Sequence, residues 1–209
     1  LYINTYAFNR EYADLEQIEI LKGPQGALYG RSAAAGAIIM STKKPSQEFE
    51  AEVRAGFAED STYTGLATVA GPLGDNVAGR LTVDYRSTDG FYYNSFLDDS
   101  VVDDAENYSV QGRIVIDPRD DLSIDTKIRY GKSEAAAITF NAAFELPPFL
   151  GFGTPGVESF YQNVNTHEFV FAGNVRPVNE QDVLEFSVKA DWDMDWATLT
   201  AWGFYSDTE

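Results

Sequence analysis

The chain contains no cysteine and only one histidine among its 209 residues. Without cysteine it can form no disulfide, no thiolate metal site and no cysteine nucleophile. With His167 as the single histidine, it cannot build a multi-histidine metal centre or a pair of catalytic histidines. We interpret His167 as a polar loop residue, and we expect no enzymatic activity, no cofactor and no metal site.

Long hydrophobic runs are also missing. No apolar stretch approaches the ~20 residues of a membrane-spanning helix, and the longest patch of small apolar residues, Ala33 to Met40, is interrupted by Gly36. This does not exclude a membrane protein, because the strands of a transmembrane barrel need only ~9–11 residues and can alternate in polarity. The chain starts at Leu1 without a signal-peptide pattern, so we expect it to be an internal part of a longer protein.

Positive charge is scarce. There are 15 Lys and Arg residues against 33 Asp and Glu residues, which gives a net charge of −18. Such a chain repels phosphates, so we expect no nucleic-acid partner. The hydrophobic content of 44% and the aromatic content of 14% are too high for a disordered chain.

From about residue 49 onward, polar and apolar residues alternate with the period of a β-strand. In one such segment, Leu122, Ile124, Ile128 and Tyr130 alternate with Ser123, Asp125, Lys127 and Arg129. The pattern predicts about seven strands. They lie near residues 49–57, 63–69, 77–86, 108–116, 122–130, 184–192 and 196–206, and the last leaves open which side chains face which way.

The connections between these strands alternate in length. Short turns with the sequences GPLGDN, DPRDD and DMD alternate with long loops at about 91–106 and 134–181. Outer-membrane barrels have this arrangement, with short periplasmic turns and longer extracellular loops. Tyr85, Tyr108 and Tyr130 lie beside long loops, whereas Trp192 and Trp196 flank a short turn, as expected for two interfacial aromatic girdles.

The alternative fold is a soluble or surface β-sandwich acting as a ligand-binding module, because its strands would alternate equally well. Mixed charges on the polar face of most strands favour a wet lumen and therefore a barrel. A transporter of roughly 22 strands would be about three times as long at this strand density. We therefore predict an all-β membrane protein and a partial antiparallel barrel of about seven strands.

The segment from Ile18 to Pro45 is punctuated by glycine and proline and precedes the first predicted barrel strand. Its characteristic residues, in order, are Glu19, Gly23, Pro24, Gln25, Gly26, Leu28, Tyr29, Gly30, Arg31, Gly36, Ala37, Ile38, Thr42, Lys43 and Pro45. This string resembles the end of the plug domain of TonB-dependent outer-membrane receptors. It departs from the family pattern at Lys22, Ala27, Ala35 and Ile39. We assign residues 1–46 to the C-terminal part of a plug domain and residues 47–209 to the N-terminal portion of a transmembrane β-barrel.

The resemblance implies an outer-membrane active-transport receptor of a Gram-negative bacterium. Such a receptor takes up a scarce nutrient, with a ferric siderophore as the first expectation and cobalamin, haem or a glycan as alternatives. Its implied partners are outer-membrane lipid, a small-molecule metal chelate, and a TonB-type energy-coupling protein that binds through a segment not in this chain. An outer-membrane enzyme is a third possibility, disfavoured by the single histidine.

The resemblance also implies which plug residues have structural or gating roles: Glu19, Lys22, Gly23, Pro24, Gly26, Tyr29, Gly30, Arg31 and Gly36. In this family, plug arginines pair with barrel carboxylates and help to hold the plug. Lys22 keeps the charge of the usual arginine but loses its planar bidentate fork, so Arg31 is the better candidate for such a contact. The alternative for both is an ordinary solvated charge in the lumen.

Two of the predicted extracellular loops are unusual in composition. The loop at 134–181 is too aromatic for a merely solvated loop, and loops of this length are usually functional or disordered. Its candidate ligand-contacting residues are Phe140, Phe144, Phe149, Phe152, Phe160 and Tyr161, which could instead form a local hydrophobic cluster or a short strand. The loop at 91–106 carries Asp98, Asp99, Asp103, Asp104 and Glu106 without the spacing of a calcium loop, and we interpret it as a solvated acidic loop.

Overall fold

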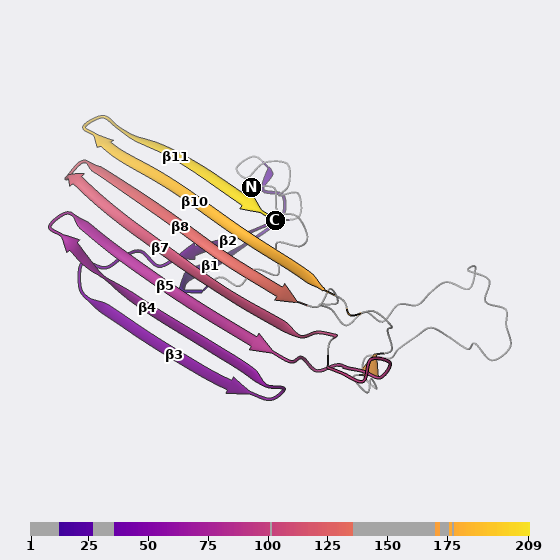
Figure 1. Cartoon of the computed structure of the whole chain (residues 1–209). Helices are drawn as coiled ribbons and strands as arrows, with labels where there is room; N and C mark the ends of the chain where they lie inside the picture. Colours follow the sequence, from indigo (N-terminus) through magenta and orange to yellow (C-terminus); the bar gives the residue numbers. More distant parts are fainter. Residues whose placement is uncertain (1–12, 27–35, 101, 136–169, 172–175, 177) are drawn as a thin grey trace.

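The computed structural model describes residues 13–26, 36–100, 102–135, 170–171, 176 and 178–209. This part of the chain forms one seven-stranded sheet and two separate strand pairs (Figure 1). Within the described residues, there is no helix long and apolar enough to cross a membrane.

The large sheet is an antiparallel meander, in which each strand pairs with the next strand of the same sheet along the chain. Its spatial order is β11-β10-β8-β7-β5-β4-β3. The strands are β3 (Glu50–Ala58), β4 (Thr62–Gly74), β5 (Val77–Thr88), β7 (Ala105–Arg119), β8 (Leu122–Ala135), β10 (Asn179–Met194) and β11 (Ala197–Thr208). All seven strands predicted from the alternating pattern are therefore confirmed.

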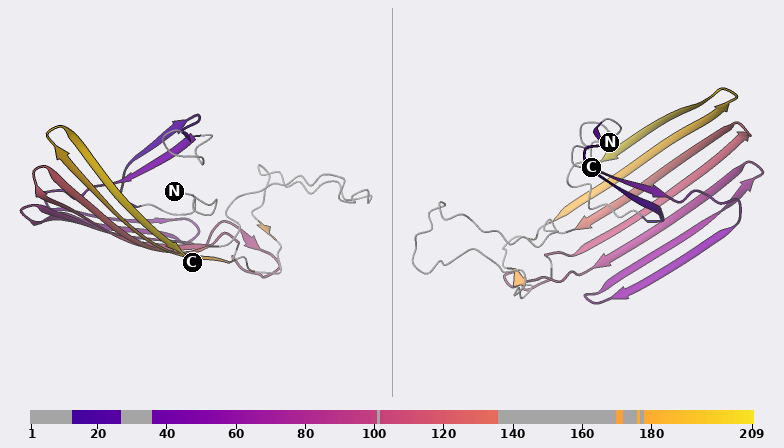
Figure 2. Two further views of the ribbon diagram at one scale, coloured as in Figure 1. Left: turned by 90° about the horizontal axis from the view of Figure 1, so that it is seen from above. Right: turned by 180° about the vertical axis from the view of Figure 1, so that it is seen from behind.

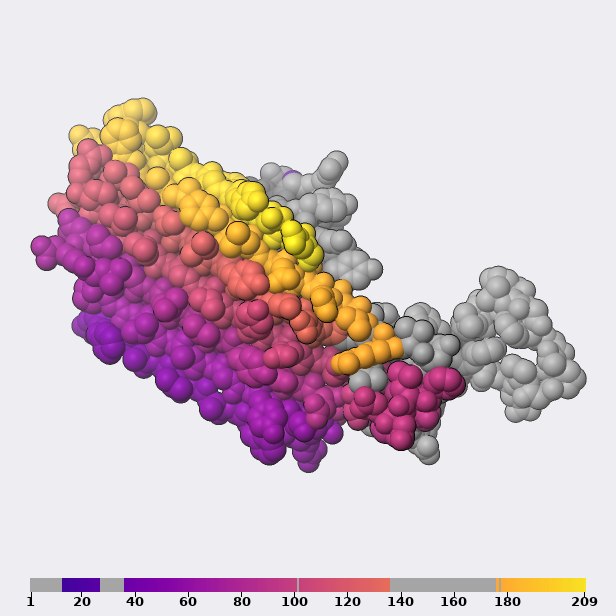
Figure 3. All heavy atoms as spheres, in the orientation of Figure 1, coloured from indigo at the N-terminus to yellow at the C-terminus, as the bar shows by residue number. Residues whose placement is uncertain are grey.

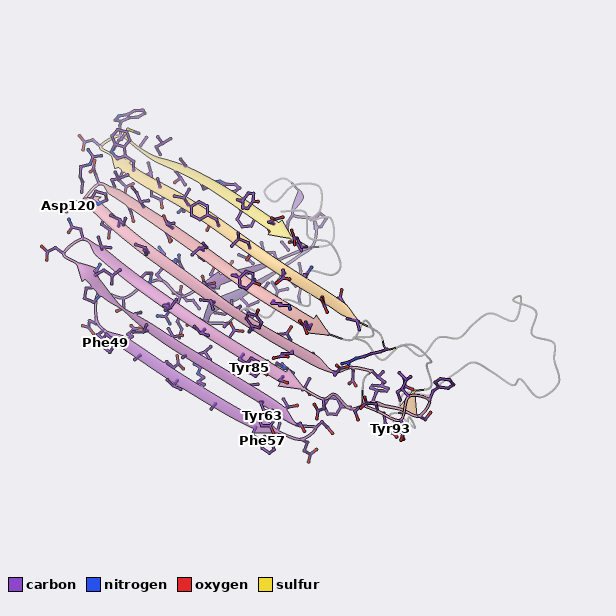
Figure 4. All side chains as sticks on the ribbon, in the orientation of Figure 1. Phe49, Phe57, Tyr63, Tyr85, Tyr93 and Asp120 are labelled. Atoms are coloured by element: carbon purple, nitrogen blue, oxygen red, sulfur yellow. The ribbon has the colours of Figure 1, made fainter. Side chains whose placement is uncertain are left out.

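The connections confirm the predicted alternation of short turns and long loops. At one end of the sheet the strands are joined by the short turns 75–76, 120–121 and 195–196, and at the other end by 59–61, 89–104 and 136–178. Phe57, Tyr63 and Tyr85 lie towards the long-loop end, whereas Phe49 and Asp120 lie at the short-turn end (Figure 4). Aromatic side chains thus occur near both ends of the strands, as interfacial girdles require.

The two faces of the sheet differ in the way that a membrane barrel requires. The outward face is apolar and open, with exposed side chains such as Val53, Leu81 and Ile128, and Figure 3 shows it as a continuous surface across the strands. The opposite face carries buried polar residues, including Arg80 and Arg129. A soluble β-sandwich buries its apolar face and exposes its polar one, so this sheet has the reverse arrangement.

The register between β10 and β11 settles how the last strand faces. Trp192 lies opposite Leu199, and Ala190 lies opposite Ala201, so Leu199 and Ala201 share the apolar outward face. On the polar face, Lys189 lies opposite Trp202. Because an aromatic side chain stands on the polar face, the alternation in this strand was not readable from the sequence.

The two long loops meet in a small parallel pair. β6 (Tyr93–Asn94) pairs with β9 (Val170–Phe171). The carboxylate of Asp103 accepts hydrogen bonds from the backbone N–H groups of Phe91 at 2.9 Å and Tyr92 at 2.9 Å. The fully buried carboxamide oxygen of Asn94 accepts from two further backbone N–H groups. Asp98, Asp99 and Glu106 are exposed, as predicted for a solvated acidic loop, whereas Asp103 is half-buried and organises the loop backbone.

The segment before the large sheet forms a separate hairpin. β1 (Leu15–Lys22) pairs antiparallel with β2 (Gly36–Thr42). Figure 2 shows this hairpin lying off one face of the curved sheet rather than extending its edge. The hairpin therefore occupies the polar side, to which its base is bonded.

Candidate functional site: the hairpin base on the polar wall

The first attachment of the hairpin to the sheet is an ion pair between Asp14 and Arg80. Asp14 directly precedes β1, and Arg80 lies on the polar face of β5. Arg80 donates two hydrogen bonds to the Asp14 carboxylate, from Nε to Oδ2 and from Nη2 to Oδ1 at 2.7 Å. Thr82 Oγ1 donates a third, to Asp14 Oδ2 at 3.1 Å. The two charged side chains are only 1% and 4% exposed, so this is a buried bidentate pair, the strong form of such contacts.

The surroundings of Asp14 keep its carboxyl group ionised. Burial raises the pKa of Asp14, but the hydrogen bond and the charge of Arg80 outweigh burial, and the net pKa is lowered. A lowered pKa in the folded state stabilises the structure at every pH above the ordinary value near 4, and this stabilisation is lost as the pH falls through the lowered pKa. The attachment is therefore fully formed at neutral pH.

The second attachment is made by Arg113, on the polar face of β7. Its Nη1 donates to the backbone oxygens of Thr42 at 2.6 Å and Lys43 at 3.0 Å, where the chain leaves β2. Its Nε and Nη2 donate to the two carboxylate oxygens of Asp125 on β8, at 2.9 and 2.6 Å. Asp125 thus orients the guanidinium of Arg113 so that its remaining donors face the hairpin.

The two attachments are joined to each other. The backbone N–H of Lys43 donates to the backbone oxygen of Asp14 at 3.1 Å, and Lys43 Nζ lies 3.7 Å from Asp14 Oδ1. Asp14 has a φ of 59°, in the left-handed region that aspartate tolerates better than most residues. Both ends of the hairpin are therefore gathered at one point on the wall formed by β5 and β7.

The wall continues beyond the hairpin base as a network of polar side chains. Arg129 on β8 contacts Glu185 on β10, with Nη1 and Oε2 3.4 Å apart. Ser109 donates to the carboxylate of Asp84, and the hydroxyls of Thr68 and Thr82 are 3.2 Å apart. Such side chains suit a polar lumen, and they would be costly if they faced lipid.

The structure places the predicted plug residues only in part. Glu19, Lys22, Gly23, Pro24, Gly26 and Gly36 lie on or next to the hairpin, while Tyr29, Gly30 and Arg31 lie outside the described residues, as do Phe140, Phe144, Phe149, Phe152, Phe160 and Tyr161. Lys22 is exposed and forms no ion pair within the described part of the chain. The ion pair observed here joins an arginine of the sheet to a carboxylate of the hairpin, whereas the family resemblance implies plug arginines paired with barrel carboxylates. The gating roles of the predicted residues remain predictions.

Two glycines have conformations that explain their place in the hairpin. Gly23, directly after β1, has a φ of 84°, and Gly36, at the start of β2, has a φ of 155°. A Cβ atom at Gly36 would lie 2.5 Å from the backbone oxygen of Leu21, whereas nothing lies within 4 Å of a Cβ at Gly23 or Gly26. Of these three hairpin glycines, only Gly36 combines a glycine-favouring backbone with a closed site.

We expect Gly36→Ala to destabilise the hairpin by about 1–3 kcal/mol, because both the backbone conformation and the contact with Leu21 oppose a methyl group. Gly26→Ala is the matched control and should change stability by less than about 1 kcal/mol, since its site is open. Hydrogen exchange of the β1 and β2 amides in the full-length protein measures the difference. Equal protection in the two variants would contradict this explanation of Gly36.

Sequence reasoning missed the residues that attach the hairpin. Arg80 and Arg113 were visible as charges on the polar faces of their strands, but nothing marked them among the other lumen charges. Asp14 carried no signal, because its partner lies 66 positions away along the chain. A search for carboxylates flanking the plug strands would have found Asp14 as one of several candidates.

A curved antiparallel sheet with an apolar outward face, and a hairpin bonded to its polar face, defines part of a plugged β-barrel. The TonB-dependent Receptor Plug Domain family model matches residues 2–37. Two curated relatives are a probable TonB-dependent receptor, BfrD, from Bordetella pertussis, 37% identical over 36% of this chain, and the ferrioxamine B receptor of Salmonella typhimurium, 42% identical over 32% of this chain. The chain is part of a TonB-dependent receptor of the Gram-negative outer membrane.

Solved structures agree on the fold. The ferric yersiniabactin uptake receptor FyuA from Yersinia pestis matches 93% of this chain with a TM-score of 0.71 at 17% sequence identity. The matched region amounts to 29% of that structure and to 10% of each of the two curated relatives. The chain thus spans under a third of the length of that solved receptor.

Proposed function

We propose that the complete protein is an active-transport receptor that carries a ferric siderophore across the outer membrane with energy from a TonB-type protein. The observation that most directly supports this proposal is that the hairpin is bonded to the polar wall through Arg80 and Arg113. A folded segment held inside a barrel obstructs its lumen, so transport requires an energy-driven rearrangement of that segment. The named functions of the ferrioxamine B receptor and of FyuA support a siderophore as the substrate.

Within this proposal, residues 1–46 are the C-terminal part of the plug and residues 47–209 are the first portion of the barrel. The plug residues Glu19, Lys22, Gly23, Pro24, Gly26, Tyr29, Gly30, Arg31 and Gly36 shape or gate the plug. The aromatic residues of the loop at 134–181 contact substrate at the extracellular mouth. The energy-coupling protein binds a plug segment that precedes the residues of this chain.

Uptake of radiolabelled iron tests the proposal. The full-length receptor is expressed in a Gram-negative strain that lacks its own siderophore receptors, and cells are supplied with a panel of ferric hydroxamates, ferric catecholates and haem, with labelled cobalamin tested separately. We expect uptake of at least one ferric siderophore that disappears when the TonB protein is deleted. Uptake of none of the iron chelates, or uptake that is unchanged without TonB, would contradict the proposal.

A barrel and a sandwich also differ in their behaviour on gels. The full-length protein, extracted in detergent, should migrate differently before and after boiling, because a closed barrel resists unfolding by detergent alone. A folded sample that dissolves without detergent and shows no such shift would favour the β-sandwich module instead.

A further inference from the structure

The positions of Arg80 and Arg113 on the wall are the starting observation. The two arginines lie directly opposite each other in the register of β5 and β7, so their side chains emerge side by side on the polar face. Like charges in such a cross-strand pair repel each other unless each is neutralised. Asp125 lies beside Arg113 within the barrel itself, but Arg80 depends on Asp14 of the hairpin.

Arg80 has only a weak substitute for Asp14. The other carboxylate that contacts it is Glu50 on β3, which lies 3.3 Å from Nη1 and is 54% exposed. Detaching the hairpin would remove both hydrogen bonds from Asp14 and leave Arg80 buried beside a second arginine. The same movement would break the hydrogen bonds that Arg113 Nη1 donates to the backbone oxygens of Thr42 and Lys43. The wall and the hairpin base are therefore complementary surfaces, and separating them leaves unpaired charges on both.

The rest of the hairpin is held differently. The hydrogen bonds and ion pairs between the described hairpin and the described sheet gather at Asp14, Thr42 and Lys43, at its base. Beyond the base, one face of the hairpin presents exposed apolar side chains that pair across β1 and β2, namely Ile18, Ile20, Ile38 and Met40. Movement of this outer part leaves the ionic contacts intact, whereas movement of the base breaks all of them.

We propose that Arg80 and Arg113 are positioning residues that keep the hairpin base on the wall of β5 and β7 throughout transport. The substrate then passes on the side of the lumen away from this wall, and the plug rearranges in parts other than the base, such as the outer part of the hairpin. This inference rests on the proposed transport function. It assigns to the two arginines a role that the plug signature itself does not carry.

Covalent locking of the base distinguishes this proposal from the alternative, in which the base leaves the wall during transport. The full-length receptor carrying Asp14→Cys and Arg80→Cys is treated in cells with a short bis-maleimide cross-linker, which adds to both thiols, and the chain adds no cysteine of its own. We expect cross-linking to leave the uptake of ferric siderophore by this variant within about twofold of its rate before cross-linking. A loss of more than about tenfold on cross-linking would overturn the proposal, because it would show that the base must leave the wall.

Two further variants control the experiment. Lys43→Cys with Glu52→Cys joins two residues whose side chains lie 3.9 Å apart, and it locks the base to β3 while Asp14 and Arg80 stay intact. Reagent-treated wild-type receptor reports any damage caused by the reagent. If the first pair does not fold, Thr42→Cys with Arg113→Cys locks the other end of the base while Asp14 and Arg80 stay intact. The same twofold and tenfold limits apply to it. Wild-type cells that take up no substrate would instead show that the transport function itself is wrong, and the inference would fall with it.

Discussion

Arg80→Ala is expected to weaken the attachment of the plug to the barrel by about 3–5 kcal/mol, because it leaves a buried carboxylate without its partner. Asp14 is 1% exposed and receives two of its hydrogen bonds from Arg80. Only Thr82 and the more distant Lys43 would remain near its charge. The free energy is measured by following urea-induced release of the plug in the purified full-length receptor, through limited proteolysis of the hairpin.

A matched control uses an arginine on the same face of the same sheet. Arg54 on β3 pairs with Glu52, but its side chain is 68% exposed, and exposed pairs are worth about 0–1 kcal/mol. Arg54→Ala should therefore leave plug release almost unchanged. In the double variant Asp14→Ala with Arg80→Ala, removing both charges should restore part of the loss. Equal effects of Arg80→Ala and Arg54→Ala would show that the buried pair does not hold the plug.

The barrel strands were predictable because each is a local pattern. A strand with one face in lipid and one in water alternates along its own sequence, and β3, β4, β5, β7, β8 and β10 all show this alternation without reference to their neighbours. Short turns between them carry Gly, Pro and Asp, whose backbone preferences are also local. The order of the strands followed, because antiparallel neighbours joined by short turns pair with each other.

What could not be predicted depends on contacts between distant residues. Asp14 and Arg80 meet only because the hairpin folds back over the sheet, and their separation in sequence hides the pair. The facing of β11 was hidden for another reason, since Trp202 stands on the polar face opposite Lys189. The parallel pairing of β6 with β9 joins two loops that no period or turn signal connects. The plug string identified the family, but it did not indicate which charges attach the plug.

Ile128→Arg is expected to cost about 2–4 kcal/mol of barrel stability, because it places a guanidinium on the lipid face near the middle of β8. Ile128 is 51% exposed on the outward face and lies opposite Gly112 and Phe186, which share that face. Its sequence neighbours Lys127 and Arg129 carry charges that the polar face accommodates. The penalty therefore arises because the side chain points towards lipid, and not because of its position along the strand.

Val115→Arg is the control that tests this reasoning, since it makes the same kind of change on the other face. Val115 lies opposite Asp125 in the register of β7 and β8, on the face that already carries the charges of Arg113 and Lys127, so an arginine there enters a wet lumen and not lipid. The two full-length variants are compared by urea unfolding from lipid vesicles and by the heat-dependent shift in gel migration. We expect Ile128→Arg to lower the unfolding midpoint and Val115→Arg to leave it nearly unchanged. If Val115→Arg proved the more damaging, the two faces would have to be exchanged, and the hairpin would lie outside the barrel.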